Sequence, residues 1–410
     1  MKNIIPLIIL TILLIGCKES PEQKDTANDE LTIGDYRGAL AVKDNKELPF
    51  LFHVYAKDSL VVYNADEEIE VTDVQYKNDS VYITLPAFEG YLVAKIEDEN
   101  LNGSFVKESL DRIVPFTAEK NITERFKSES KSNLNVSGSW ETVFSKGVEG
   151  DEYIAKGIFK QEGQKVTGTF RTTTGDYRFL EGVMDGNNLK LSAFDGAHAF
   201  LFEAVVSDST MNGTFYSGNH WKEPFTAVRN ETYELPNADG LTALKEGYDT
   251  LEFTFPDLQG NPVSISDKKF EDKVVIVQVM GSWCPNCLDE TNYYTKFYKD
   301  QKPANVEFVA LAFEYAKTKQ SALASLNRLK TDANIPYPIL LAQYGSSDKE
   351  EAQRKLPMLD KVLSYPTTIF VDKKGKVRKI HTGFNGPATG EKYTEFQKEF
   401  KDFVAMLSAE

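Results

Sequence analysis

The stretch VVIVQVMGSWCPNC occupies residues 274–287. Its first half is an apolar, β-branched run of the kind found in a buried parallel strand. Gly281 and the serine after it interrupt the run, and Pro285 stands where the first turn of a helix tolerates proline. The stretch therefore predicts a strand, a tight turn and a helix that begins at two cysteines, Cys284 and Cys287.

This placement predicts a reactive thiol. A cysteine at the start of a helix faces unpaired backbone N–H groups and the positive end of the helix dipole, and both stabilise a thiolate. Such cysteines have pKa values of about 3.5–7.5, against about 8.5 for a free cysteine. We interpret Cys284 as the attacking thiol and Cys287, one turn further along and less exposed, as the resolving thiol.

The C-x-x-C pattern has two other interpretations. A zinc site needs two more Cys or His ligands at suitable spacing, and the four histidines of the chain form no H-x-H or H-x3-H pair. A purely structural disulfide is disfavoured, because so short a loop restricts the unfolded chain little. We therefore expect neither a metal nor an organic cofactor.

The length and charge of the chain limit the classes of protein to which it can belong. A chain of 410 residues is too long for one core, so two or three domains are expected. The formal net charge is −15, and no stretch is densely basic, which argues against nucleic acid as a partner.

Residues 1–17 have the pattern of a targeting segment. Lys2 precedes an apolar run that is too short for a typical spanning helix and ends in LIGC at Cys17. This ending resembles the lipobox of bacterial lipoproteins, which implies that Cys17 becomes the lipidated first residue of the mature chain. A plain signal peptide with an incidental cysteine is the alternative. The resemblance implies a lipid-anchored protein of the bacterial cell envelope, at the periplasmic face, in the outer membrane or on the cell surface, with residues 18–31 as a flexible tether.

Residues 32–122 and 136–230 are predicted to be two β-rich repeats, each a barrel or a sandwich of short antiparallel strands. A ligand-binding barrel is one interpretation, and spacers or partner-docking modules are the favoured one. We interpret Tyr36, Trp140 and Trp221 as core or rim aromatics. The motifs that match between the copies are Gly34-Asp35-Tyr36 with Gly138-Ser139-Trp140, Ala87-Phe88-Glu89-Gly90 with Ala193-Phe194-Asp195-Gly196, Leu101-Asn102-Gly103-Ser104-Phe105 with Met211-Asn212-Gly213-Thr214-Phe215, and Pro115-Phe116-Thr117-Ala118 with Pro224-Phe225-Thr226-Ala227.

Residues 246–410 resemble the TlpA-like and ResA-like branch of thioredoxin-fold proteins. The motifs are FTFPDLQG at 253–260, the W-C-P-N-C motif after its strand, and YPTTIFVD at 365–372, in the order and at the distances typical of the family. The resemblance implies an α/β domain with a central mixed sheet flanked by helices.

The same resemblance implies a set of substrate-binding residues. In the family the peptide bond before the equivalent of Pro366 is cis and packs beside the cysteines, so that the backbone of Tyr365 can pair with an extended substrate segment. A trans proline in an ordinary loop is the alternative. Trp283 and Pro285, which flank Cys284, complete the predicted substrate-binding set.

Glu290 is a candidate acid. Helical periodicity places it on one inward stripe with Cys287 and Tyr294. A buried carboxyl has a raised pKa and can move protons to and from Cys287. The resembled family often has Glu here, whereas the position of the usual buried acid of thioredoxins is Gln278 in this chain. The alternative is a solvated first-turn glutamate favoured by the helix dipole.

These predictions together describe an exported, lipid-anchored reductase of protein disulfides. Its partners would be disulfide-bearing exported proteins and, as the resemblance implies, a membrane thiol protein that donates electrons. Two alternatives come from other classes. One is a binding or docking lipoprotein that carries a thioredoxin-like module. The other is a thiol peroxidase, which would need Thr and Arg around Cys284.

Overall fold

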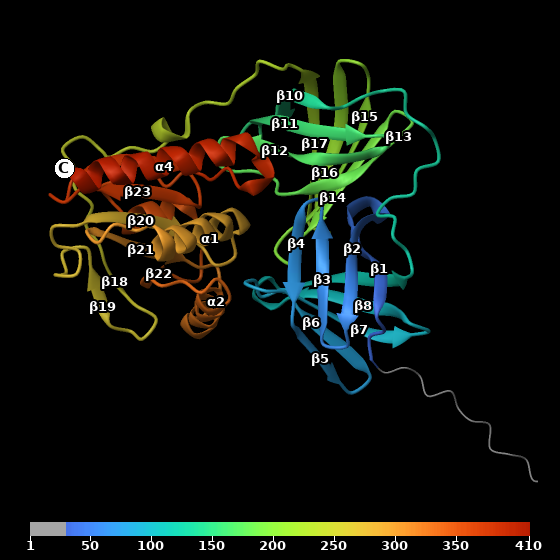
Figure 1. The fold of residues 1–410 in the computed structure, drawn as a ribbon, viewed down its shortest axis with the longest axis horizontal. Coiled ribbons are helices and arrows are strands. Elements are labelled where there is room, and N and C mark those ends of the chain that lie inside the picture. Colours follow the sequence, from blue (N-terminus) through green and yellow to red (C-terminus); the bar gives the residue numbers. More distant parts are fainter. Residues whose placement is uncertain (1–29) are drawn as a thin grey trace, which may run out of the picture.

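The computed structural model describes residues 30–410, which form two β-rich parts and a C-terminal α/β domain packed beside both of them (Figure 1). The predictions for residues 1–17, for lipidation of Cys17 and for nearly all of the tether at 18–31 lie outside the described residues. Between residues 30 and 410, no helix combines the length and the apolar character needed to cross a membrane.

The first β-rich part is a nine-stranded antiparallel sheet with the order β4-β3-β2-β1-β9-β8-β7-β6-β5. It curls because β1 pairs with β9, but it stays open where β4 and β5 follow one another without pairing. The elements are β1 (Gly34–Val42), η1 (Lys43–Asn45), β2 (Lys46–Ala56), β3 (Ser59–Asn64), β4 (Glu67–Val71), β5 (Asp73–Lys77), β6 (Ser80–Thr84), β7 (Tyr91–Glu97), β8 (Asn100–Lys107), η2 (Glu108–Leu110) and β9 (Arg112–Lys120).

The second β-rich part is a closed antiparallel barrel of β10 to β17. Each strand pairs with the next along the chain, and β10 pairs with β17 to close the barrel, which leaves no sheet edge. Its strands are β10 (Gly138–Phe144), β11 (Tyr153–Glu162), β12 (Lys165–Thr172), β13 (Leu180–Asp185), β14 (Asn188–Phe194), β15 (Ala199–Val206), β16 (Thr210–Ser217) and β17 (Trp221–Arg229).

Motifs that match in the sequence occupy equivalent strands in the two β-rich parts. Gly103 of β8 is opposite Phe116 of β9, and Gly213 of β16 is opposite Phe225 of β17. The same register therefore recurs in both copies. The predicted all-β region is confirmed, with one copy open and the other closed.

Aromatic side chains fill the barrel. Phe144 stacks on Tyr153 with ring centroids 4.8 Å apart, and Phe202 stacks on Phe215 at 4.5 Å. Trp140 is fully buried, while Trp221 is 43% exposed at the rim. This packing supports the interpretation of these aromatics as core and rim residues and leaves the barrel axis occupied by side chains.

The C-terminal domain is built around a five-stranded mixed sheet with the order β22-β21-β20-β23-β24. All residues of the central strand β20 are buried, in keeping with its apolar sequence. Strands β20, β21 and β22 are parallel, whereas β23 and β24 are antiparallel to their neighbours. The predicted α/β domain is therefore confirmed. Its elements are η3 (Ala238–Gly240), β18 (Thr254–Pro256), β19 (Pro262–Ser264), β20 (Val274–Met280), α1 (Pro285–Asp300), β21 (Val306–Phe313), α2 (Lys319–Asp332), β22 (Ile339–Gln343), α3 (Lys349–Lys355), β23 (Thr367–Val371), β24 (Val377–Thr382), η4 (Pro387–Thr389) and α4 (Glu391–Ala409).

We predict that Phe144→Ala destabilises the barrel by about 3–5 kcal/mol, because it leaves a cavity among rings that cannot collapse into it. The measurement is urea unfolding of the full chain followed by far-UV circular dichroism, compared with Val205→Ala. The Val205 side chain is 59% exposed, so its truncation should change stability by less than about 0.5 kcal/mol. Equal effects of the two substitutions would contradict the packed-barrel description.

Candidate active site

The two cysteines lie at the junction of β20 and α1 and form a disulfide with a Cα–Cα distance of 5.2 Å. Cys284 is the N-cap of α1, and the backbone N–H of Cys287 donates to its sulfur at 3.2 Å. Cys284 is 7% exposed and Cys287 is fully buried. The helix terminus thus directs an N–H group that has no partner within the helix at the outer sulfur, as the sequence predicts.

The loop before β23 lies against this disulfide. The peptide bond between Tyr365 and Pro366 is cis, as the family resemblance implies. The carbonyl oxygen of Tyr365 lies 3.5 Å from Cys284 Sγ. The Trp283 ring packs edge-on against the Tyr365 ring with centroids 5.6 Å apart, and its Nε1 donates to the carbonyl of Phe313. These residues form one compact site around the outer sulfur.

Glu290 lies beneath the cysteines with no exposed surface. Its carboxylate accepts hydrogen bonds from Thr368 Oγ1 at 2.8 Å, Gln278 Nε2 at 2.9 Å and Tyr294 OH at 3.0 Å. Gln278 Nε2 also lies 3.4 Å from the carbonyl oxygen of Cys287, so this amide joins the acid to the inner cysteine. Burial raises the pKa of Glu290 to about 7, although these donors oppose the shift. The glutamate is therefore inward-facing, and the solvated alternative is wrong.

A second buried acid, Glu314, lies under the turn that carries the cysteines, and the sequence analysis did not single it out. It follows β21 directly and accepts hydrogen bonds from the backbone N–H of Ser282 at 2.8 Å and from Ser282 Oγ at 2.6 Å. Burial raises the pKa of Glu314 to about 7, against these two hydrogen bonds. A lone glutamate at the end of an apolar strand gives no periodic signal, so only the tertiary contact identifies it.

A loop of the barrel covers the other side of the site. This loop, residues 173–179, joins β12 to β13 and is called the barrel loop below. The carbonyl of Thr174 accepts a hydrogen bond from Ser364 Oγ at 3.4 Å, next to the cis peptide bond. A Cβ atom at Gly383 would collide with the Thr174 backbone, and one at Gly175 would collide with the Asn286 side chain. Tyr365 is only 7% exposed in this arrangement, and its predicted pairing with an extended substrate segment stays a prediction.

The barrel loop ends in a buried arginine that contacts all three parts of the chain. Arg178 is 5% exposed and donates through Nη1 to the carbonyl of Pro285, at 3.4 Å, in the first turn of α1. It also forms ion pairs with Asp289 of α1, with Glu67 of β4 and, at 3.6 Å, with Asp195 of the turn between β14 and β15. Sequence analysis found the motif that contains Asp195 but had no signal for its partner.

The structure brings most of the predicted site residues together. The disulfide is formed by Cys284 and Cys287, and Glu290 lies below it. The residues around the disulfide are Trp283, Pro285, Tyr365 and Pro366. Their roles in catalysis and substrate binding stay predictions. Cys17 is outside the described residues.

Comparison with known proteins places this site in a family. Residues 245–395 match the family model described as Redoxin. This part of the chain is called the Redoxin domain below, after the matching model. Both β-rich parts lie outside the Redoxin domain, which carries Cys284 and Cys287.

Curated relatives of the Redoxin domain have names that describe one chemistry. The chain is 23% identical over 156 residues to the thiol-disulfide oxidoreductase ResA of Halalkalibacterium halodurans, covering 38% of this chain and 78% of the relative. It is 27% identical over 142 residues to ResA of Geobacillus kaustophilus, covering 35% of this chain and 72% of the relative. It is 26% identical over 140 residues to the thioredoxin-like protein YneN of Bacillus subtilis, covering 34% and 73%. Thiol–disulfide oxidoreductase, the predicted enzyme class, is the class named for both ResA relatives.

We predict that Glu290 and Glu314 titrate near pH 7, where their pKa values are held by burial, whereas an exposed glutamate titrates near about 4.3. Because the folded chain holds these two protons more tightly than the unfolded chain does, stability falls as pH rises from about 4.3 to about 7. Carbon-13 NMR of labelled glutamate side chains measures this titration. Glu290→Gln and Glu314→Gln should each remove one late-titrating resonance, and a resonance that persists in both variants would contradict the assignment.

Proposed function

We propose that this chain is an exported, lipid-anchored thiol–disulfide oxidoreductase that reduces disulfides of other exported proteins through Cys284 and Cys287. The observation that carries the proposal is the bonded cysteine pair at the N-terminus of α1, with the cis Tyr365–Pro366 peptide 3.5 Å from the outer sulfur. The C-x-x-C spacing, the names of the relatives and the Redoxin match support the same chemistry.

The proposed reaction begins with the reduced pair. The Cys284 thiolate attacks one sulfur of a substrate disulfide, and the other substrate sulfur leaves as a thiolate. The Cys287 thiolate then attacks Cys284 in the mixed disulfide and releases the second substrate thiol. Two electrons pass to the substrate, and the chain is left with its Cys284–Cys287 disulfide. An external dithiol, proposed to be a membrane thiol protein, restores the reduced pair.

The assignment of attacking and resolving roles is supported by exposure and by the helix terminus. Cys284 is the more exposed sulfur and receives the N–H of Cys287, which stabilises a thiolate there. Cys287 is fully buried, with Cys284 on its outer side and the polar side chains of Gln278 and Glu290 below it. A nucleophile must meet its substrate first, so the outer cysteine is the one suited to attack.

Glu290 is proposed to accept the proton that Cys287 releases, while the Gln278 side chain holds the carboxylate below the inner cysteine. A group with a pKa near the working pH holds and releases a proton most readily, and the pKa of Glu290 is raised to about 7. The proton that Cys287 must lose before it attacks has no open path to solvent, because both residues are fully buried. The buried carboxyl supplies an acceptor for that proton.

The proposed location rests on the first residues of the sequence. Lys2, the short apolar run and LIGC ending at Cys17 have the pattern of a lipoprotein signal, which leads to an anchored protein outside the cytoplasm. Disulfides form and persist in that compartment, so substrates for the proposed reaction are present there.

The thiol peroxidase alternative has less support. An arginine does come close to Cys284, because Arg178 lies 3.4 Å from the Pro285 carbonyl. Its guanidinium, however, is engaged by Asp289, Glu67 and Asp195, so it is not free to bind a peroxide.

We expect that Cys287→Ser traps a covalent complex between Cys284 and a substrate protein, because the mixed disulfide can no longer be resolved. The complex should be visible in intact cells as a band on a non-reducing gel that disappears with dithiothreitol. Cys284→Ser, alone and combined with Cys287→Ser, is the matched control and should trap nothing. Wild-type chain should also catalyse insulin reduction by dithiothreitol, and a chain that fails both assays would overturn the proposal.

We expect Glu290→Gln to slow resolution of the mixed disulfide by about 100-fold or more at neutral pH, since proton transfer to a positioned carboxylate is lost. The wild-type rate should show an inflection near pH 7, the pKa of Glu290, and the variant should lack it. Stopped-flow absorbance after mixing the reduced chain with dithiobis(nitrobenzoate) measures this step, because attack by Cys287 releases the thionitrobenzoate held on Cys284. Glu314→Gln serves as the control that keeps the Glu290 inflection. Identical rates and pH profiles in wild type and Glu290→Gln would refute the proton role.

A further inference from the structure

The barrel loop lies where a protein substrate of the proposed reaction would lie. An extended segment bound to this type of site pairs with the backbone beside the cis proline, like an added strand. In this chain, Ser364 donates to the Thr174 carbonyl at 3.4 Å, and Thr174 also packs directly on Gly383. Gly175 packs on Asn286, between the two cysteines. The loop backbone thus contacts both the cis-proline loop and the C-x-x-C motif.

The barrel holds this loop in a fixed shape. Tyr177 is partly buried at the end of the barrel, where its ring packs against Phe202 and Phe215 with centroids 5.3 and 5.1 Å apart. Its hydroxyl meets that of Tyr153, which in turn donates to Glu223 at 2.8 Å. The loop is therefore part of a packed element, and it can leave the redox site only if the barrel moves or the loop unpacks.

Polar contacts of Asp176 and Arg178, called the clasp below, connect the barrel loop to the Redoxin domain. Asp176 accepts the backbone N–H of Gly386 at 2.6 Å, and Arg178 reaches Asp289 and the Pro285 carbonyl on α1. These side chains are nearly completely buried. A buried charge that loses its partner is costly, so these contacts stabilise the covered arrangement strongly.

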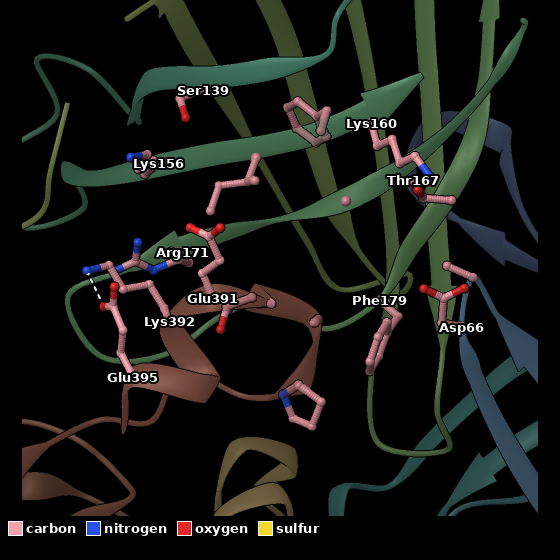
Figure 2. A pocket seen from close by; sticks show the side chains of 18 of the residues that line it. Asp66, Ser139, Lys156, Lys160, Thr167, Arg171, Phe179, Glu391, Lys392 and Glu395 are labelled. Atoms are coloured by element: carbon pink, nitrogen blue, oxygen red, sulfur yellow. Dashed lines mark hydrogen bonds and ion pairs between the residues drawn. The ribbon is translucent and has the colours of Figure 1, made fainter. Parts of the chain in front are cut away.

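Part of the boundary between the barrel and the Redoxin domain is an open cleft lined by charged and apolar side chains. This cleft of about 500 Å³ lies between β11, β12 and the start of α4, and Figure 2 shows side chains that line it. Charged side chains of both signs line it, among them Lys156, Arg171, Lys392 and Glu395. Boundaries of this polar kind are typical of domains that move relative to each other. The contacts of the barrel loop, together with the hydrogen bond from Arg171 Nε to Asn385 Oδ1 at 3.1 Å, connect the barrel to the redox site.

We propose that the barrel loop gates the redox site, so that a protein disulfide reaches Cys284 only after the loop has left its place beside Tyr365 and Asn286. This proposal rests on the proposed oxidoreductase function and specifies how that function is controlled. In the covered arrangement Cys284 is 7% exposed and Cys287 is buried, which leaves the extended segment of a protein substrate no place to bind. Weakening the clasp should then expose Cys284 and speed its reaction with large partners.

The test measures access to Cys284 directly. The full chain carries Cys17→Ser and Cys287→Ser, so that Cys284 is its one remaining thiol, since the sequence holds three cysteines. The reduced protein is alkylated with a maleimide that bears a polyethylene glycol chain, and the modified fraction is followed over time on gels. Arg178→Gln should raise the alkylation rate about tenfold or more, the change that corresponds to about 1.4 kcal/mol in the opening equilibrium.

A matched control keeps the loop in place. Arg125 is also a buried arginine, but its partners Pro49, Ser192 and Glu181 all belong to the β-rich parts. Arg125→Gln should therefore leave the alkylation rate unchanged. Asp176→Ala removes the contact to Gly386 without leaving a positive charge unpaired, and it provides the decisive measurement when Arg178→Gln fails to fold by circular dichroism.

Insulin reduction, measured in parallel on chains with both cysteines, separates the gate from the function itself. Faster alkylation together with faster insulin reduction in Arg178→Gln or Asp176→Ala supports the gate. Alkylation that is equally fast in wild type, both clasp variants and Arg125→Gln overturns the gate, whether or not insulin is reduced. Faster alkylation with no insulin reduction by any chain supports the gate and overturns the proposed function.

Discussion

The ion pairs of one buried guanidinium hold the three parts of this protein together. Arg178 belongs to the barrel, Glu67 to the open sheet and Asp289 to the redox helix, and all three side chains meet away from water. Taking a charge out of water costs several kcal/mol unless partners compensate it. A placement that buried one of these charges without the others would leave it uncompensated. The assembled chain satisfies them together, so the electrostatics of one residue favour one relative placement of the parts.

The same placement puts corresponding loops of the two β-rich parts at the redox domain. In the open sheet, the backbone N–H of Ala87 donates to Asp332 at 2.8 Å and the Phe88 carbonyl accepts from Arg328 at 3.0 Å. In the barrel, Asp195 of the matching motif lines one pocket together with Asp289 and Asn292 of α1. A motif that is repeated in the sequence therefore serves the same boundary twice. Loops at one end of a rigid sheet are well suited to such contacts, because they vary without disturbing the strands.

The two copies differ where the redox site is covered. In the open sheet, β4 and β5 are joined by Thr72 alone and do not pair. In the barrel, β12 and β13 pair and are joined by residues 173–179, which provide the loop over the cysteines. Beneath that loop, Glu290 and Glu314 form polar contacts at the ends of the central parallel strands. Ligand and reaction sites of open α/β sheets lie at these ends, since the strand-to-helix turns there expose backbone groups.

Local pattern was enough to predict much of this protein. The apolar run before Gly281, the proline in the first helical turn and the spacing of Cys284 and Cys287 specify a strand, a turn and a helix, because each signal acts within a few residues. The inward position of Glu290 follows from helical periodicity, and the β-rich repeats follow from matched motifs. Contacts between residues far apart in the sequence had no such signal. The pairing of Arg178 with Asp289, the acid Glu314 beneath Ser282, the closure of one copy and the barrel loop beside Tyr365 depend on how the three parts pack, and neither periodicity nor composition carries that information.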